Sequence, residues 1–428
     1  MDVLLVGSGG REHALAWRLK QSSRVGKIFI APGNGGTSNV AEAIPIGVME
    51  FEKLADFAEE KKVGLTITGS DDPIVGGIGD FFRARGLRIW SPSKAAAQLE
   101  GSKAFAKEIM REAGVPTAEF RVFTNHDEAV AYVREKGAPI VVKASGLALG
   151  KGVSVCKTLE QAEQFLHDVM VKKIFKDSGN EVVIEELLEG PEISIHALSD
   201  GKDFLMFPSS QDHKAVGEGD MGKNTGGMGV VAPLPWVTPA QMEEIKSTIV
   251  APTLHAMSAR GTPFQGLLYP GLMMTKDGPK VIEFNSRFGC PEAEVYMRLM
   301  KTDLLDLLEA SVDGTIASQR IEWNPGFAAT VIIASGGYPG EYAKGLPITG
   351  IEEAEEIRGV VVFHAGTMID LRNQSLVTAG GRVLSVSGVG ATLKEALDTA
   401  YTGISKIHFE GMYFRRDIGA KALATWMV

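Results

Sequence analysis

Residues 281–285, VIEFN, alternate apolar and polar side chains as a β-strand does. The alternation puts Glu283 and Asn285 on one face of the strand. A carboxylate beside a carboxamide supplies the hard oxygen atoms that Mg²⁺ prefers, often together with phosphate groups. Arg287 follows, and its guanidinium suits a bidentate contact with an anion. The segment indicates a metal and phosphate site, although a polar strand edge facing solvent has the same pattern.

A second candidate is the glycine-rich stretch ASGLALGKG at 144–152, which lies between two strand-like segments. It departs from a Walker A loop because its first two glycines have three residues between them and Gly152 stands where a Ser or Thr belongs. Since a strand follows, we expect a hairpin that covers a polyphosphate. Lys151 lies on this hairpin, and Lys143 ends the preceding strand. A surface hairpin with solvated lysines is the alternative.

The chain begins with a strand, the glycine-rich turn GSGGRE and a helix. Amides at such a helix start can hold a phosphate, here around Gly9 and Gly10. A dinucleotide site needs a glycine where Glu12 stands, so a nicotinamide-dependent dehydrogenase is disfavoured. Gly33 and Asn34, after the second strand, are expected to close the same pocket. Plain turns are the alternative at both places.

Two polar motifs, QDHK at 211–214 and NTGGMG at 224–229, flank a glycine-rich stretch with little sign of a core. Long polar loops in compact domains are usually functional or mobile. Asp212 and Lys214 are therefore candidates for substrate contact. His213 is either a general base or a loop histidine without a chemical role. The acidic run at 185–192, taken alone, reads as solvated charge.

The elements around these motifs suggest three regions. In the first hundred residues, strands near 3–6, 27–30, 65–68 and 87–90 alternate with helices, which predicts a parallel sheet wrapped by helices. Further strands are expected at 140–143, 153–157, 182–185, 193–198, 267–274 and 281–285, and then at 329–334, 360–364 and 383–386, before a helix at 393–407. We expect domains at 1–101, 102–325, with a lid-like part at about 120–190, and 326–428.

The composition limits the partners. The chain has 428 residues, 44% of them hydrophobic, and a net charge of −9, which argues against nucleic acid or an anionic membrane. Two cysteines make neither a disulfide framework nor a zinc motif, and they fit a reducing compartment. No apolar run approaches the length of a membrane span. We expect a soluble, cytoplasmic monomer that acts on small molecules.

Taken together, the motifs resemble the ATP-grasp superfamily and, within it, the glycinamide ribonucleotide synthetase family. The resemblance covers nearly the whole chain in one order: GSGGREHA, KASGLALGKGV, SQDHK, NTGGMG, GLLYPGLM, VIEFNSRFG, GGYPG, HAGT and GGRVL. It implies an α/β and α+β multidomain fold. A parallel α/β domain would come first, then an ATP-grasp fold with a lid-like subdomain, and then a mixed α/β domain.

The resemblance also implies a reaction. ATP, glycine and 5-phosphoribosylamine would give glycinamide ribonucleotide, ADP and phosphate through a glycyl phosphate, in purine biosynthesis. ATP would bind with Mg²⁺, and Mn²⁺ is the alternative ion. An ATP-grasp ligase for another acid or amine is a close alternative, and a non-catalytic nucleotide sensor is a more distant one.

The family's functional residues can be carried over position by position. Implied phosphate contacts are Lys103 and Lys143, with Lys151 and Gly152 on the covering hairpin. The implied adenine hinge is Glu185, Glu186, Leu187 and Leu188, and Glu192 would bind the ribose. Glu283 and Asn285 would be the metal ligands. The substrate side would hold Arg287, Asp212 and Lys214, and the phosphoribosylamine pocket Gly9, Gly10, Gly33 and Asn34.

The chain departs from the family pattern at several positions. Ser145 and Leu149 stand where the pattern has Asp and Ala, and Cys290 stands where it has Asp. Asp71 and Asp72 occupy a place where Pro and Glu are usual. These positions affect the hairpin, the metal or substrate site, and the sugar-phosphate contacts.

Overall fold

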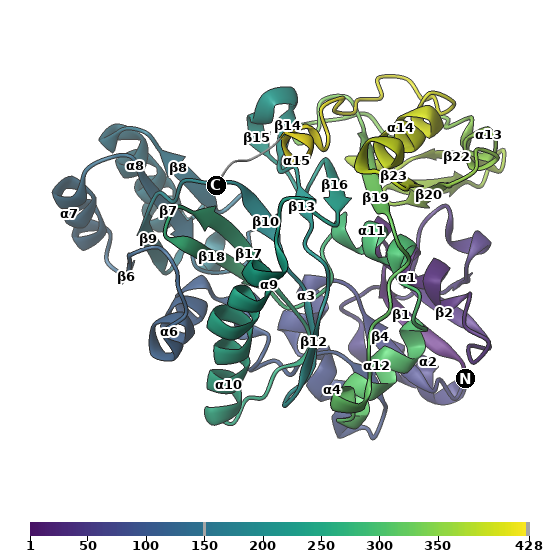
Figure 1. The fold of residues 1–428 in the computed structure, drawn as a ribbon, viewed down its shortest axis with the longest axis horizontal. Coiled ribbons are helices and arrows are strands. Elements are labelled where there is room, and N and C mark those ends of the chain that lie inside the picture. Colours follow the sequence, from purple (N-terminus) through teal and green to yellow (C-terminus); the bar gives the residue numbers. More distant parts are fainter. Residues whose placement is uncertain (149–150, 425–428) are drawn as a thin grey trace.

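The computed structural model describes residues 1–148 and 151–424 (Figure 1). Leu149 lies outside the described residues. Among the described helices, none combines the length and the apolar character needed to cross a bilayer.

The N-terminal domain is built on a five-stranded parallel sheet in the order β3-β2-β1-β4-β5. Its strands are β1 (Val3–Gly7), β2 (Ile28–Pro32), β3 (Glu42–Ala43), β4 (Leu65–Thr68) and β5 (Ile89–Trp90). The connecting helices are α1 (Gly10–Leu19), α2 (Phe51–Glu60), α3 (Asp71–Gly76) and α4 (Ile78–Ala84). Val3 and Leu5 enter one core and Leu4 and Val6 another, so β1 is covered on both faces. The predicted parallel α/β domain is confirmed.

The lid-like part carries an antiparallel sheet in the order β6-β9-β7-β8 (blue in Figure 1). Its strands are β6 (Phe120–Phe123), β7 (Ile140–Ala144), β8 (Val153–Cys156) and β9 (Val182–Glu186). Helices α7 (His126–Lys136) and α8 (Leu159–Leu166) complete it, and it has an apolar core of its own. The glycine-rich stretch joins the paired strands β7 and β8, as the sequence predicts.

Next to the lid, a second antiparallel sheet carries residues 281–285, the segment predicted to hold a metal ion. Its strands are β10 (Glu192–Ser194), β11 (Ala197–Asp200), β12 (Phe204–Met206), β17 (Gln265–Thr275) and β18 (Gly278–Asn285). Helices α5 (Gln98–Gly101), α6 (Lys103–Ala113), α9 (Pro239–Ile245) and α10 (Ala251–Ala259) belong to the same region.

The prediction of one strand over 193–198 is wrong, because β10 and β11 are separate strands that both pair with β17. The break faces Pro270 of β17, whose carbonyl accepts a hydrogen bond from the Ile195 amide at 3.2 Å. Proline has no amide hydrogen to give in return, so the ladder is interrupted there.

The third sheet has the order β13-β16-β19-β23-β20 and combines distant parts of the chain. Strands β13 (Gln211–Asp212) and β16 (Gly229–Ala232) come from the middle region, whereas β19 (Phe327–Ala334), β20 (Val360–His364) and β23 (Arg382–Gly390) come from the last hundred residues. The predicted polar stretch around 211–229 is therefore anchored by two buried strands. The domain limits at 101/102 and 325/326 stay a prediction.

The remaining elements complete the C-terminal half. Two hairpins are formed by β14 (Ala215–Gly217) with β15 (Met221–Asn224), and by β21 (Thr367–Asp370) with β22 (Ser375–Thr378). The helices are α11 (Glu292–Leu299), α12 (Leu304–Asp313), α13 (Ile351–Glu355), α14 (Leu393–Ile404) and α15 (Ala420–Leu423). Figure 1 shows α14 beside the third sheet and α11 between that sheet and the N-terminal domain. In this arrangement the N-terminal domain, the middle region and the C-terminal region border one cavity.

Candidate active site

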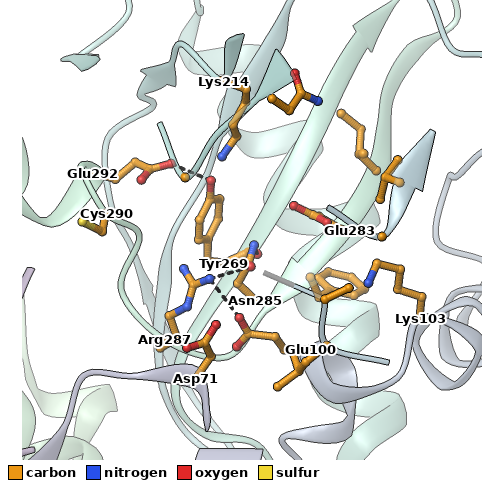
Figure 2. Close-up of a pocket in the computed structure, with 18 of the residues that line it drawn as sticks. Asp71, Glu100, Lys103, Lys214, Tyr269, Glu283, Asn285, Arg287, Cys290 and Glu292 are labelled. Atoms are coloured by element: carbon orange, nitrogen blue, oxygen red, sulfur yellow. Dashed lines mark hydrogen bonds and ion pairs between the residues drawn. The ribbon is translucent and has the colours of Figure 1, made fainter. Parts of the chain in front are cut away.

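A cavity of about 600 Å³ lies where these parts meet. Its wall includes Gly9 and Asp71 from the N-terminal domain, Lys103 and Glu283 from the middle region, and Arg382 from the C-terminal region. Figure 2 shows the centre of this cavity, with charged side chains converging on it from several elements. The cavity is the candidate active site.

Glu283 and Asn285 both line the cavity from β18, as the alternation predicts. Among the described residues, the Glu283 carboxylate has no hydrogen-bond or ion-pair partner. The Asn285 side-chain oxygen accepts a hydrogen bond from Nη2 of Arg287 at 3.1 Å. An open carboxylate beside an oriented amide oxygen fits a divalent ion that takes its other ligands from phosphate and water. In the described part of the chain, no cluster of three or more His, Cys, Asp or Glu side chains offers a more complete metal site.

Arg287 also lines the cavity, but its charge is already matched within the protein. Nη2 forms an ion pair with Glu100 at 2.9 Å. Burial works against the charged form, but Glu100 and Asp71 raise the pKa of Arg287 above its usual value. Asp71, which lines the same wall, has its pKa lowered by Arg287 and Arg11 despite its burial. Arg287 therefore orients Asn285 as well as facing the substrate space.

Two buried lysines share one carboxylate beside the cavity. Lys107 Nζ lies 2.5 Å from Glu185, and Lys143 also pairs with Glu185. Lys143 donates to the Ile282 carbonyl at 2.9 Å, which ties it to the metal-site strand. Burial lowers the pKa of Lys107 to about 8. Sequence reasoning missed Lys107, although its position one helical turn after Lys103 was an available signal.

The predicted adenine hinge does not line the cavity, because Glu185, Glu186, Leu187 and Leu188 are not among its lining residues. Glu192, the predicted ribose-binding acid, does line it. The Glu186 carboxylate accepts a hydrogen bond from the Glu119 amide at 3.0 Å. The hairpin is similar, since Gly152 lines the cavity and the exposed Lys151 does not.

Asp212 and Lys214 form an ion pair of 2.8 Å, and Lys214 faces the cavity. His213 between them has a structural role. Its Nδ1 contacts the Gly229 carbonyl and its Nε2 accepts from the Gly419 amide, both at 3.0 Å. Burial lowers the pKa of His213 to about 4. The structure therefore does not favour His213 as a general base.

Sequence reasoning also missed a buried acid on the wall opposite Glu283. Glu292 accepts a hydrogen bond from the Tyr269 hydroxyl at 2.5 Å (Figure 2) and another from the Ser194 hydroxyl at 2.9 Å. Burial alone would raise the pKa of Glu292, but Lys214, His196 and the tyrosine hydrogen bond lower it. Glu292 therefore stays ionised and adds negative charge beside Lys214. No motif pointed to it, because its partners lie on three different elements.

The N-terminal glycine turn reaches the cavity through Gly9, whereas Gly10, Gly33 and Asn34 are not lining residues. The Gly9 amide donates to the buried Glu12 carboxylate at 2.7 Å, so this amide is not open to a phosphate. A Cβ at Gly69 would lie only 2.1 Å from Glu12 Oε1, which shows how closely Glu12 covers the strand ends where a dinucleotide would lie. Asn34 Nδ2 donates to the carbonyls of Ser8 and His364, both at 2.8 Å.

Two departures from the family pattern have clear surroundings. The Ser145 hydroxyl accepts a hydrogen bond from the Ala104 amide at 3.1 Å, which joins the glycine-rich stretch to the start of α6. Cys290 lines the cavity, and burial raises its pKa to about 12, so it is a neutral thiol where the pattern has a charged Asp.

Comparison with known proteins assigns this architecture. Residues 1–100 match the phosphoribosylglycinamide synthetase N domain, 101–293 its ATP-grasp (A) domain and 328–421 its C domain. The chain is 46% identical over 420 residues to a phosphoribosylamine–glycine ligase of Caldanaerobacter subterraneus subsp. tengcongensis, covering 98% of this chain and 100% of that one. It is 47% identical over 427 residues to the enzyme of that name from Pseudomonas aeruginosa, covering 99% of both chains.

A crystal structure of the Thermotoga maritima phosphoribosylamine–glycine ligase aligns with a TM-score of 0.85 at 33% identity, covering 97% of this chain and 100% of that chain. All three matched domains contribute residues to the wall of the cavity. The chain belongs to the phosphoribosylglycinamide synthetase family.

Proposed function

We propose that this chain catalyses the ATP-dependent ligation of glycine to 5-phosphoribosylamine, giving glycinamide ribonucleotide, ADP and phosphate in purine biosynthesis. The observation that carries the proposal is the open carboxylate of Glu283, next to the oriented amide of Asn285, in a cavity that also holds Lys103 and Lys143. The family relationship supports the choice of glycine and phosphoribosylamine as substrates.

The reaction needs an activated carboxylate, because a free carboxylate is a poor acyl donor. An oxygen of glycine attacks the γ-phosphorus of ATP, ADP leaves, and glycyl phosphate forms. The amino nitrogen of phosphoribosylamine then attacks the acyl carbon, phosphate leaves with the former carboxylate oxygen, and the nitrogen loses a proton. Catalysis of this kind rests on positioning and on charge stabilisation.

The chain's cations and acids divide this work. We assign Lys103 and Lys143 to the ATP phosphates, and Arg287, Asp212 and Lys214 to the substrate side. Glu283 and Asn285 would hold a divalent ion, Mg²⁺ or Mn²⁺, whose charge offsets that of the polyphosphate when it is bound. Closure of the hairpin that carries Gly152 would exclude water from the acyl phosphate.

The test is a coupled assay for ADP release with ATP, Mg²⁺, glycine and freshly generated phosphoribosylamine. We expect ADP release that requires both glycine and the amine, together with formation of glycinamide ribonucleotide. ADP release that is indifferent to glycine would overturn the proposal. A panel of other small acids and amines in the same assay distinguishes the related ligases.

A further inference from the structure

The cations around the cavity differ in whether the protein neutralises them. Seven cationic side chains line it, and five pair with a carboxylate: Arg11 with Glu12, Lys107 and Lys143 with Glu185, Lys214 with Asp212, and Arg287 with Glu100. The other two, Lys103 and Arg382, have no carboxylate partner among the described residues.

Lys103 and Arg382 lie on opposite sides of the cavity. In Figure 2, Lys103 is on the right with Glu283, and Cys290 is on the left. Arg382 is on the Cys290 side, because its Nη1 donates to the Cys290 carbonyl at 2.7 Å. The same nitrogen donates to the carbonyls of Gly226 and Gly227. The cavity therefore has two separate positions where positive charge is unmatched.

Neither of the two acids near Arg382 forms an ion pair with it. Glu294 contacts the Ser385 hydroxyl at 3.3 Å and the Cys290 thiol at 3.7 Å, and burial raises its pKa to about 7. Asp212 is paired with Lys214. Since Cys290 is a neutral thiol, it supplies no counter-charge.

A half-buried guanidinium without a counter-charge is unfavourable unless a ligand supplies that charge. Only Nη1 of Arg382 is used by protein acceptors among the described residues, so Nη2 and Nε of this cavity-lining arginine are left for a ligand. Tyr338 lines the same wall, and its hydroxyl oxygen accepts from the Gly226 amide at 3.4 Å. Its own hydrogen is therefore available to a second acceptor.

We propose that Arg382, together with the Tyr338 hydroxyl, binds the phosphate group of 5-phosphoribosylamine. This deepens the proposed function and rests on it. The two unmatched cations correspond to two phosphorylated substrates. Lys103 faces ATP beside the metal-site strand, and Arg382 faces the sugar phosphate across the cavity. In phosphoribosylamine the phosphate is at the opposite end of the sugar from the reacting amine, so its holder has to lie away from Glu283.

The experiment compares Arg382→Gln and Arg382→Lys with the wild type. In the coupled assay, we expect Arg382→Gln to raise the KM for phosphoribosylamine about 10- to 100-fold, the range for losing a charge-assisted hydrogen bond, with little change in the KM for ATP or glycine. Arg382→Lys keeps the charge and should restore part of the loss. Arg298→Gln is the matched control, because Arg298 is a half-buried arginine that donates to the carbonyls of Ser387 and Gly359 outside the cavity.

Ribose 5-phosphate is a stable probe of the same contact, with unphosphorylated ribose as its control. Calorimetry should show ribose 5-phosphate binding to the wild type and to Arg298→Gln, with loss of binding in Arg382→Gln and no binding of ribose. Equal rises in all three KM values, or unchanged ribose 5-phosphate binding in a folded Arg382→Gln, would refute the phosphate contact. Absence of glycine-dependent ADP release in the wild type would instead refute the proposed function, and the binding measurement would still decide the role of Arg382.

Discussion

Arg287 holds Asn285 in place: its Nη2 donates to the Asn285 side-chain oxygen at 3.1 Å while the same guanidinium is anchored by Glu100 at 2.9 Å. A primary amide can rotate and present nitrogen instead of oxygen to a cation. The hydrogen bond fixes which atom faces Arg287 and thereby orients the carboxamide beside Glu283. Residues that orient metal ligands in this way strongly affect metal affinity.

Replacing Arg287 with lysine tests this orientation. Lysine keeps the charge for Glu100 but lacks the planar fork that reaches two partners at once. We expect Arg287→Lys to raise the Mg²⁺ concentration for half-maximal activity about 10- to 100-fold, the range typical of lost ligand support. Titration of ADP release against Mg²⁺ at saturating substrates measures it. An unchanged Mg²⁺ requirement would show that Asn285 needs no such support.

The open carboxylate of Glu283, the one acid on β18, is expected to be essential for catalysis. Glu283→Gln keeps the size and removes the charge, so we expect a fall in kcat of about 100-fold or more, because metal stabilisation is worth several kcal/mol. Glu356→Gln is the control, since Glu356 is exposed and does not line the cavity. Steady-state rates of both variants decide the matter, and equal small effects would contradict the metal assignment.

Because Glu185 is shared by two buried lysines, we expect a double variant that also loses one lysine to be more stable than Glu185→Gln alone. Glu185→Gln leaves Lys107 and Lys143 buried together without a counter-charge, so we expect a loss of about 3 kcal/mol or more in the free energy of unfolding. Adding Lys107→Met removes one of the two lysines and should recover part of that loss. Urea unfolding of the two single variants and the double variant measures the coupling. Simple additivity would mean that the three groups do not act as a unit.

Asn34 connects the N-terminal glycine turn to the C-terminal region, through the carbonyls of Ser8 and His364. Asn34→Asp has nearly the same shape, but it replaces the donor with an anion facing two carbonyl oxygens. We expect a loss of about 1–3 kcal/mol in the free energy of unfolding and a raised KM for phosphoribosylamine, because Gly9 borders the cavity. Asn39→Asp, at an exposed position five residues away, is the control. Equal effects at both positions would argue against the bridge.

How much of the fold could be predicted depended on whether the signal was local. The four apolar residues 3–6 and the glycine turn after them indicate a buried strand and a helix start without reference to the rest of the chain. The pairing of β16 with β19 joins residues about a hundred positions apart, and neither segment carries a sequence signal that identifies the strand with which it pairs. Likewise, the break at Ile195 is caused by Pro270, on a strand whose register was not known in advance.

The same distinction applies to the site. The placement of Glu283 and Asn285 on one wall of the cavity could be predicted, because the two residues alternate within one strand. Glu292 was missed, because its ionised state depends on Lys214 and Tyr269, which converge on it only in the folded chain. Arg382 lies in a recognised motif, but its unmatched charge becomes visible only when the partners of every other cation in the cavity are known.

Four buried histidines predict how the stability of the whole fold depends on pH. Burial lowers the pKa to about 3 for His13 and His196 and to about 4 for His213 and His364. In the unfolded chain each has a pKa of about 6.5. Below that pH the unfolded state takes up protons that the folded state does not, so the stability that the histidines contribute is complete above pH 6.5 and falls as the pH decreases toward the folded-state pKa values.

Each histidine contributes up to about 1.4 kcal/mol per pH unit to this slope, so all four together approach about 5–6 kcal/mol per unit well below pH 6.5. Urea unfolding between pH 7.5 and 5.5 measures the net slope, in which Glu294 and Asp212, whose pKa values burial raises to about 7, act in the opposite direction to the histidines. His213→Gln removes one titrating group, and we expect the slope to change by up to about 1.4 kcal/mol per pH unit, whatever the variant's stability at pH 7.5. A slope unchanged by His213→Gln would mean that His213 takes up a proton as readily in the folded chain as in the unfolded one, and its contacts with Gly229 and Gly419 would then be too weak to exclude the charge.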